Sequence, residues 1–564
     1  MADNFCGRYG DLLTGSYDCV DRVVLNAYFP LGHNPGEFRT WWRRWHDGSD
    51  DQLDDTHLMR MAGRFARRVK AWGQANDVPV IYCKAGQRKH RVAEEYLATH
   101  EVRTGVFLIL AAKAPASVWE VRRSPSSGVI GTIAKKTAYV NHYSFHIIDP
   151  QWGHVTIKMS GHPPYPAQVI LNAHEHVAAR ARAAGIGFAK EGNCFTEIAD
   201  PQGLARVADA LSQPAAIGRL GQVCDRWIYT ACLCFGLDLA EQGMSGFRYS
   251  YTVYQAEYSR NLLFRDGAQM EELFDRVIDR TRSRLDIPAV RTIFGLKNRP
   301  HSNRAAGPPA QEIVVENSRY GLTWFRILFG KLQVKAYTKG EHVLRFEATV
   351  HNTRELRCRR GIDNFPQIIT ALAGIADRFA TALDCADVGF ITDGFLDQLP
   401  LPSAIGATRA GGIDLNKPRI RAALAAALAL ASAPRGFTVA DYAAHVQLTS
   451  GQAGYTIRQA AYDLRKLRGK ALVVKTGHSR RYHVPPSAAR TIAALLTLRD
   501  KIIAPLAAGI RTPRRGMPPK NWSTIDRNYE TLRRDMKTLL TNLGITTKAT
   551  RASTTNCRSR PATL

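Results

Sequence analysis

The segment Thr438–Pro485 constrains the fold of this chain most, because it carries in order the signals of a short helix, a longer helix and a β-hairpin. Thr438 and Asp441 match a capping box, in which two side chains satisfy free backbone amides at a helix start. The longer helix is predicted over residues 451–468, where Gly469 would stop it. Apolar residues recur in it at intervals of three and four and predict one buried stripe, made of Ile457, Ala460, Ala461, Leu464 and Leu467.

The other face of the longer helix and the hairpin carry side chains that can donate hydrogen bonds to phosphates and base edges. The hairpin is predicted from two strands, Leu472–Lys475 and Arg480–Val484, around a turn that contains Gly477. The candidate nucleic-acid-binding residues are Thr456, Arg458, Gln459, Tyr462, Arg465, Lys466 and Arg468 on the helix and Lys475, His478, Arg480 and Arg481 on the hairpin. A solvated basic helix beside a structural hairpin is the alternative interpretation.

Two helices followed by a basic hairpin form the pattern of a winged helix-turn-helix, and residues 418–500 resemble in this pattern the bacterial regulators of the MarR type. The resemblance implies that the longer helix enters the major groove of duplex DNA while the hairpin contacts phosphate or the minor groove. Residues 415–564 hold 27 Lys and Arg against 6 Asp and Glu, so they carry +21 of the net charge of +28. This charge favours a polyanionic partner.

Duplex DNA is the partner that we expect. RNA is an alternative, with the basic helix face Arg64–Lys70 as a second contact, because basic surfaces do not distinguish the two nucleic acids. A membrane is not expected, since the chain shows no long apolar span and no amphipathic helix with aromatic anchors. Ten scattered cysteines without a CxxC pair predict reduced thiols in a bacterial cytoplasm and argue against a zinc ribbon. The N-terminus shows no secretory signal.

Alternating helix and strand signals predict an α/β or α+β multidomain protein, with roughly three or four domains at this length. The predicted regions are a mixed α/β domain (1–210), a helical region (211–298), a β-meander plus helix (311–399), the winged helix-turn-helix (418–500) and a basic helix with a disordered tail (511–564). Within the first region, residues 167–184 are predicted to begin as a strand and to turn helical near Ala173. Within the second, residues 250–264 are predicted to be a helix.

A second candidate site lies on two predicted neighbouring strands, Lys331–Tyr337 and Val343–Val350. Alternation places Tyr337 and Lys339 on one face of the first strand, and Arg345, Glu347 and Thr349 on one face of the second. Across a hairpin, Tyr337, Lys339, Arg345 and Glu347 are expected to converge. Cross-strand pairs of this kind often only stabilise a sheet, which is the simpler interpretation.

The strands around Tyr337 and the LRFEAT sequence at Glu347 resemble a part of the replication initiators of filamentous and related phages. The resemblance implies that Tyr337 is a catalytic nucleophile supported by Glu347, and that its attack on a phosphodiester leaves a protein–DNA link and a free 3′ hydroxyl. Mg²⁺ or Mn²⁺ would be the cofactor of such an enzyme. The chain also resembles uncharacterised bacterial proteins that share the AYTKG and LRFEATVHNT strands, which implies a link to mobile genetic elements without an established activity.

The metal site of such an initiator is not evident in this sequence. The only His-x-His is His174–His176, with an acidic residue between, and His142 and His146 are spaced too widely along a predicted strand to share one ion. Carboxylates that could hold two metal ions are Asp21, Asp149, Glu175 and Glu191, if they converge. Glu257 is interpreted instead as the partner of Arg260 in a surface pair on a helix.

Overall fold

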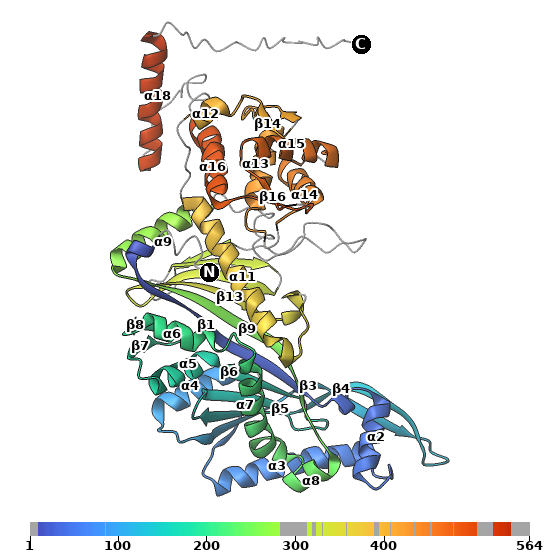
Figure 1. The fold of residues 1–564 in the computed structure, drawn as a ribbon. Coiled ribbons are helices and arrows are strands. Elements are labelled where there is room, and N and C mark those ends of the chain that lie inside the picture. Colours follow the sequence, from blue (N-terminus) through green and yellow to red (C-terminus); the bar gives the residue numbers. More distant parts are fainter. Residues whose placement is uncertain are drawn as a thin grey trace, which may run out of the picture. The chain divides into compact units, whose positions relative to one another are not determined.

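The structure is a computed structural model that describes residues 9–282, 313–317, 323–504 and 523–542, apart from residues 85, 330, 357, 388–393, 407, 434–435, 452–453 and 478. The described residues form two compact units, one of residues up to Asp384 and one of the residues that follow (Figure 1). Both units combine helices with strands, so the protein is of mixed α/β class. No helix in the described ranges is long and apolar enough to span a membrane.

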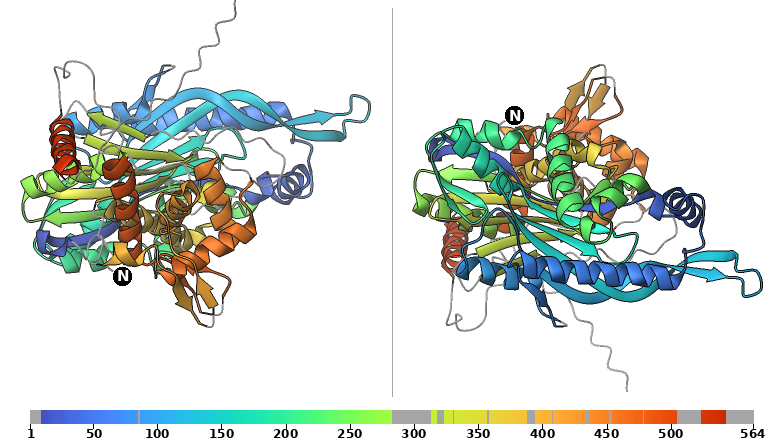
Figure 2. Two further views of the ribbon diagram at one scale, coloured as in Figure 1. Left: turned by 90° about the horizontal axis from the view of Figure 1, so that it is seen from above. Right: turned by 90° about the horizontal axis from the view of Figure 1, so that it is seen from below.

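An 11-stranded sheet forms the centre of the large unit. Its strands pair antiparallel throughout, except for the parallel pair β2–β3 at one edge. In spatial order they are β10 (Ile313–Asn317), β11 (Thr323–Phe329), β12 (Leu332–Lys339), β13 (Val343–Val350), β9 (Ser250–Phe264), β1 (Leu13–Tyr28), β6 (Ala167–Asn172), β5 (Gly153–Ser160), β4 (Ile130–Asp149), β3 (Gly105–Arg123) and β2 (Val80–Tyr82). β3 and β4 continue past the other strands as a two-stranded ribbon (Figure 2).

Residues 250–264 form strand β9, so the predicted helix there is wrong. The last seven residues of β9 are all buried, on both faces, and the strand lies between β1 and β13 in the middle of the sheet. Burial on both faces removes the alternation of apolar and polar residues that would identify a strand. Strand β9 pairs with β1 and with β13, which were expected in two other regions of the chain. The three expected regions therefore share one sheet, and the expected boundaries at 210 and 311 do not separate compact units.

Helices pack on the sheet through regularly spaced apolar residues. On α3, Leu58, Met61, Phe65 and Val69 are buried at intervals of three and four, and Phe65 packs against Tyr143 of β4. On the opposite half of the sheet, Phe346 of β13 packs against Phe379 of α11. The helices are α2 (Pro35–Trp45), α3 (Asp55–Ala75), α4 (Lys89–Thr99), α5 (Ala173–Ala183), α6 (Pro201–Asp209), α7 (Ala215–Ala231), α8 (Leu239–Ser245), α9 (Gly267–Arg282) and α11 (Phe365–Asp387). A separate hairpin, β7 (Phe188–Glu191) and β8 (Cys194–Ile198), follows α5.

The second unit has its own core beneath α13 (Pro418–Ala429), α14 (Val439–Ser450), α15 (Ile457–Gly469) and α16 (Pro486–Thr497). Two short hairpins accompany them, β14 (Ser403–Ile405) with β15 (Thr408–Ala410) and β16 (Val474–Lys475) with β17 (Tyr482–His483). A bridge pairs Phe437 with Tyr482, next to the β16–β17 hairpin. The last described helix is α18 (Thr524–Asn542), and none of its described residues belongs to this core. The expected tail beyond Asn542 lies outside the described residues.

The helix predicted from Gly451 begins six residues later, at Ile457. Gly451 instead ends α14 in the left-handed conformation (φ 66°), which glycine adopts at little cost. The capping box predicted at Thr438 is confirmed, and a second one at Thr456 starts α15. The predicted buried stripe is confirmed for Ala460, Leu464 and Leu467 but is wrong for Ile457 and Ala461, which are exposed.

Candidate functional site

The first candidate site is a polar network on one face of the large sheet. Strand register places Arg345 opposite Tyr337, and Glu347 opposite Lys335. The Tyr337 hydroxyl donates a hydrogen bond of 2.8 Å to Glu347 Oε2, and Lys335 Nζ donates one of 2.8 Å to Glu347 Oε1. Of the four residues expected to converge across a hairpin, Tyr337, Arg345 and Glu347 do so, and Lys335 is a further member. Lys339 lies farther along and bonds Asn193.

Asp21 enters the network from a bulge in the central strand β1. Val20 pairs with Tyr258 and Arg22 with Glu257, so Asp21 is the extra residue between two regular pairs. The Arg345 guanidinium donates to the Asp21 carboxylate, to Asn261 Oδ1 at 3.0 Å and to the Asn193 carbonyl at 3.0 Å. Both side chains of this ion pair are fully buried, which makes each partner depend on the other.

Burial and charge determine the protonation of the network. Burial would raise the pKa of Glu347, but Lys335 and Arg345 outweigh it and lower that pKa to about 2. Burial raises the pKa of Tyr337 well above its usual range, and the Glu347 carboxylate adds to this shift. Burial likewise raises the pKa of Asp21 to about 7 although Arg345 opposes it. In this arrangement Tyr337 is a neutral phenol that Glu347 orients.

The β7–β8 hairpin contacts this network through Asn193. Asn193 lies in the turn of this hairpin. Its side-chain oxygen accepts a hydrogen bond from Lys339 Nζ (2.7 Å), and its backbone carbonyl accepts one from Arg345. Tyr337 is only 6% exposed. A polynucleotide could reach the Tyr337 hydroxyl only after the residues that bury it had moved.

Glu257 belongs to the same face, and its predicted helical surface pair with Arg260 is wrong. Both residues lie on β9, three positions apart, so their side chains point to opposite faces of the sheet. Burial and the nearby Glu347 raise the pKa of Glu257. Arg260 instead pairs with Asp18 and Asp377.

The other predicted metal ligands do not converge. Asp149 Oδ2 accepts from Arg226 and Trp227, and Glu175 pairs with Lys190. His174 stacks on Phe195 whereas His176 stacks on Trp152, so these two histidines face different neighbours. Within the described ranges, one group of three possible ligands lies close enough to share an ion, namely Cys19, Asp21 and His174.

The second candidate site is the outer surface of α15 with the β16–β17 hairpin. Ile457 and Tyr462 are 54% and 43% exposed, and they form one surface with the exposed Arg458, Ala461 and Arg465. Of the predicted contacts, Thr456, Lys475, Arg480 and Arg481 are also exposed, Lys466 and Arg468 are half-buried, and His478 lies outside the described residues. Gln459 Oε1 accepts from the Thr456 amide at 2.8 Å, so this side chain helps to cap the helix.

Asp463 orients α15, a role that sequence patterns did not indicate. Its carboxylate is buried on the inner face of the helix, where it accepts from Arg419 of α13 (2.9 Å) and from the Tyr455 hydroxyl (2.8 Å). These two bonds tie α15 to α13 and to the residue that precedes its N-cap. The two hydrogen bonds on the inner face of α15 thereby fix the orientation of its outer surface.

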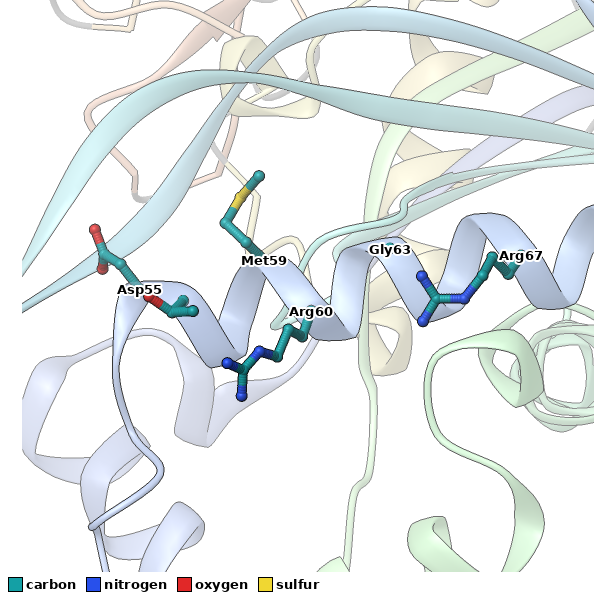
Figure 3. A pocket seen from close by; sticks show the side chains of 6 residues that line it. Asp55, Met59, Arg60, Gly63 and Arg67 are labelled. Carbon is teal, nitrogen blue, oxygen red and sulfur yellow. The ribbon is translucent and has the colours of Figure 1, made fainter.

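The basic face predicted at Arg64–Lys70 is divided by the fold. Arg64 and Arg68 form ion pairs with Glu241 and Asp238 at the start of α8, so their charges are already paired. Arg67 lines an open pocket of about 480 Å³ on α3, together with Asp55, Thr56, Met59, Arg60 and Gly63 (Figure 3). The side chains of Arg60 and Met59 point away from one another, and the pocket offers no converging polar groups (Figure 3).

Comparisons with protein-family models, with curated proteins and with solved structures found no match for this chain. The resemblances to regulators and to phage initiators therefore remain predictions.

Proposed function

We propose that this protein binds duplex DNA and that its C-terminal unit is a winged helix. The observation that carries the proposal is the outer surface of α15, where Arg458, Tyr462 and Arg465 are exposed on a helix held from beneath by Asp463. In a winged helix the third helix enters the major groove. The order α13, α14, α15 and β16–β17 agrees with this arrangement.

The chemistry of the surface suits a base-reading helix. Arginine can bond guanine O6 and N7 at once, and the exposed apolar groups of Ile457 and Ala461 suit a thymine methyl. Arg480 and Arg481 on the hairpin would contact phosphate. No ion pair to a carboxylate engages Arg458 or Arg465 in the described part of the chain, so their charges are available to a polyanion.

Selection of bound duplexes from a random pool, followed by fluorescence anisotropy on the selected sequence, tests this function with the full chain. Replacing Arg458 and Arg465 by Ala should reduce the preference for the selected over a random duplex, by about 1–3 kcal/mol per lost bidentate base contact. Arg122→Ala, on the β3–β4 ribbon, is the matched control and should keep it. Selection of structured RNA in place of duplex DNA, or unchanged preference in the double variant, would contradict the proposal.

A second function, tyrosine-mediated cleavage of DNA, has one specific observation in its favour. The Tyr337 hydroxyl is 2.8 Å from Glu347, beside Lys335 and Arg345, whose charges could stabilise a pentacovalent phosphate. In this reaction the Tyr337 hydroxyl passes its proton to Glu347 as its oxygen bonds to phosphorus, the bond to the 3′ oxygen breaks, and that oxygen takes up the proton. The products are a tyrosyl phosphodiester and a free 3′ hydroxyl.

This second function predicts a covalent adduct that depends on Tyr337. Full-length protein incubated with supercoiled and single-stranded DNA and Mn²⁺ or Mg²⁺ should nick the DNA and carry a labelled strand through denaturing electrophoresis. Tyr337→Phe should remove both signals, whereas Tyr258→Phe, on the other face of the sheet beside Asp18, should keep them. Nicking that survives Tyr337→Phe would exclude this residue as the nucleophile.

A further inference from the structure

Asp21, which pairs with Arg345, also lies close to two other side chains that commonly ligate metal ions, Cys19 and His174. Cys19 and Asp21 come from β1, and His174 is the second residue of α5. The Cys19 sulfur, an Asp21 oxygen and a His174 ring nitrogen all lie within 4.8 Å of one another. All three residues are buried, His174 completely. Each therefore lies where water cannot complete its hydrogen bonding.

Polar atoms in this group lack the partners that buried polar atoms normally have. Within the described residues, the two ring nitrogens of His174 have no hydrogen-bond partner. Oδ1 of Asp21 has none either. The other Asp21 oxygen is held by Arg345, so the carboxylate cannot rotate freely. The His174 ring stacks on Phe195 at 4.3 Å between centroids, which holds the plane of the imidazole. The His174 ring and one Asp21 oxygen are thus oriented but unsatisfied, whereas the Cys19 thiol donates to the Val20 carbonyl at 3.3 Å.

We propose that Cys19, Asp21 and His174 bind one divalent transition-metal ion of the zinc class. Sulfur, nitrogen and oxygen donors together suit Zn²⁺, whereas Mg²⁺ takes oxygen ligands alone. Metal–ligand bonds of about 2.0–2.3 Å require small shifts of these side chains toward a common centre. Binding removes the proton of the Cys19 thiol and releases it to solvent, because the thiolate is the ligand.

Arg345 would then act as an outer partner of the ion through Asp21. Outer partners of metal ligands commonly orient the ligand and raise the affinity for the ion. The same guanidinium lies beside Glu347. The ion would therefore stabilise the sheet network through Asp21 and Arg345 and would not contact DNA. The inference does not rest on either proposed DNA function, since ion binding is measured without nucleic acid.

Metal content tests the proposal directly. Full-length protein without a histidine tag, purified from zinc-supplemented cells without chelator, should contain one zinc per chain by inductively coupled plasma mass spectrometry. Cys19→Ser and His174→Asn should each lower the affinity by at least about 100-fold in competition with a chromophoric chelator, more than outer-partner changes commonly cost. His176→Asn, two positions along α5 from the ligand His174 and stacked on Trp152, and Cys358→Ser should retain the ion.

Cobalt substitution makes the test independent of variant folding. Wild-type protein prepared with Co²⁺ should show the near-ultraviolet charge-transfer absorption of a cobalt–thiolate bond, because Cys19 supplies the sulfur. Wild-type protein without metal, cobalt protein without this absorption, or full metal content in both ligand variants would overturn the proposal. Equal loss of the ion in His176→Asn would also overturn the proposal, since the loss would then not be specific to the three proposed ligands.

Discussion

The sheet network and the α15 surface use charged residues in opposite ways. In the network, Glu347 and Asp21 are buried and each is paired with a cation from another strand of the sheet. On α15, Arg458 and Arg465 are exposed and point away from the core. Buried charges are costly unless they are paired, whereas exposed charges cost little and remain available. The network is therefore a buried cluster of mutually paired groups, whereas the charges of the α15 surface face solvent.

The difference also corresponds to the two functions that we propose. A closed site with oriented groups suits chemistry on a bound substrate, and an open basic helix suits recognition. Four predictions test the contrast, beginning with the largest effect.

Arg345→Met should destabilise the large unit by about 3–5 kcal/mol, because it leaves the buried Asp21 carboxylate without its cation. Urea unfolding followed by tryptophan fluorescence reports on this unit, where Trp41, Trp42 and Trp152 are buried. Arg122→Met, which breaks an exposed pair with Glu120, is the control and should cost at most about 1 kcal/mol. Equal effects of the two changes would mean that the network is not an interdependent buried cluster.

Glu347 should make the large unit sensitive to acid. Its pKa in the folded state is lowered from 4.5 to about 2, so its contribution to stability is present above pH 4.5 and is lost as the pH falls toward 2. Glu347→Gln should flatten the fall in unfolding free energy over this range. Glu341→Gln, at the exposed turn between β12 and β13, serves as the reference and should leave the profile unchanged. A steep acid profile in Glu347→Gln would refute this assignment.

Thr456→Ala should loosen the start of α15 by about 0.5–2 kcal/mol, since the hydroxyl that caps the Gln459 amide is removed. Hydrogen exchange measured by mass spectrometry should accelerate in peptides from α15. The large unit should be unaffected, and Thr476→Ala, in the β16–β17 turn, should leave α15 unchanged. Unchanged exchange in Thr456→Ala would show that packing alone holds the helix start.

Arg480→Ala with Arg481→Ala should produce the smallest effect. Two lost phosphate contacts would lower the slope of log affinity against log salt by about 0.9 each, with the preference among sequences kept. Anisotropy titrations across salt concentrations measure both quantities. A changed sequence preference with an unchanged slope would move base reading from α15 to the hairpin.

Local patterns predicted the parts of the fold that neighbouring residues determine. The capping box at Thr438, the change from strand to helix at Ala173 and the pairing of the two strands around Tyr337 and Glu347 follow from short spacings, and all three are present. This pairing was enough to bring Tyr337, Arg345 and Glu347 together. These signals depend on residues fewer than about 20 positions apart, within the reach of helix and hairpin rules.

The remaining features depend on contacts between distant residues. Arg345 bonds Asp21 across 324 positions, and no local signal marks the bulge that exposes Asp21 to it. The contact of Asn193 with Arg345, the strand identity of residues 250–264 and the meeting of Cys19 with His174 likewise arise only from the pairing of the sheet. Long-range strand pairing is set by packing of the whole unit, which periodicity in one segment does not encode.

Binding of the selected duplex by two variants in parallel tests the division between the two regions most directly. Fluorescence anisotropy with full-length protein should give Tyr337→Phe the same Kd as the wild type, because its hydroxyl is covered and bonded to Glu347. Replacing Arg458 and Arg465 by Ala should weaken binding at least tenfold, the ratio that corresponds to about 1.4 kcal/mol. Equal weakening by Tyr337→Phe, or unchanged affinity in the α15 variant, would contradict the assignment of DNA recognition to α15.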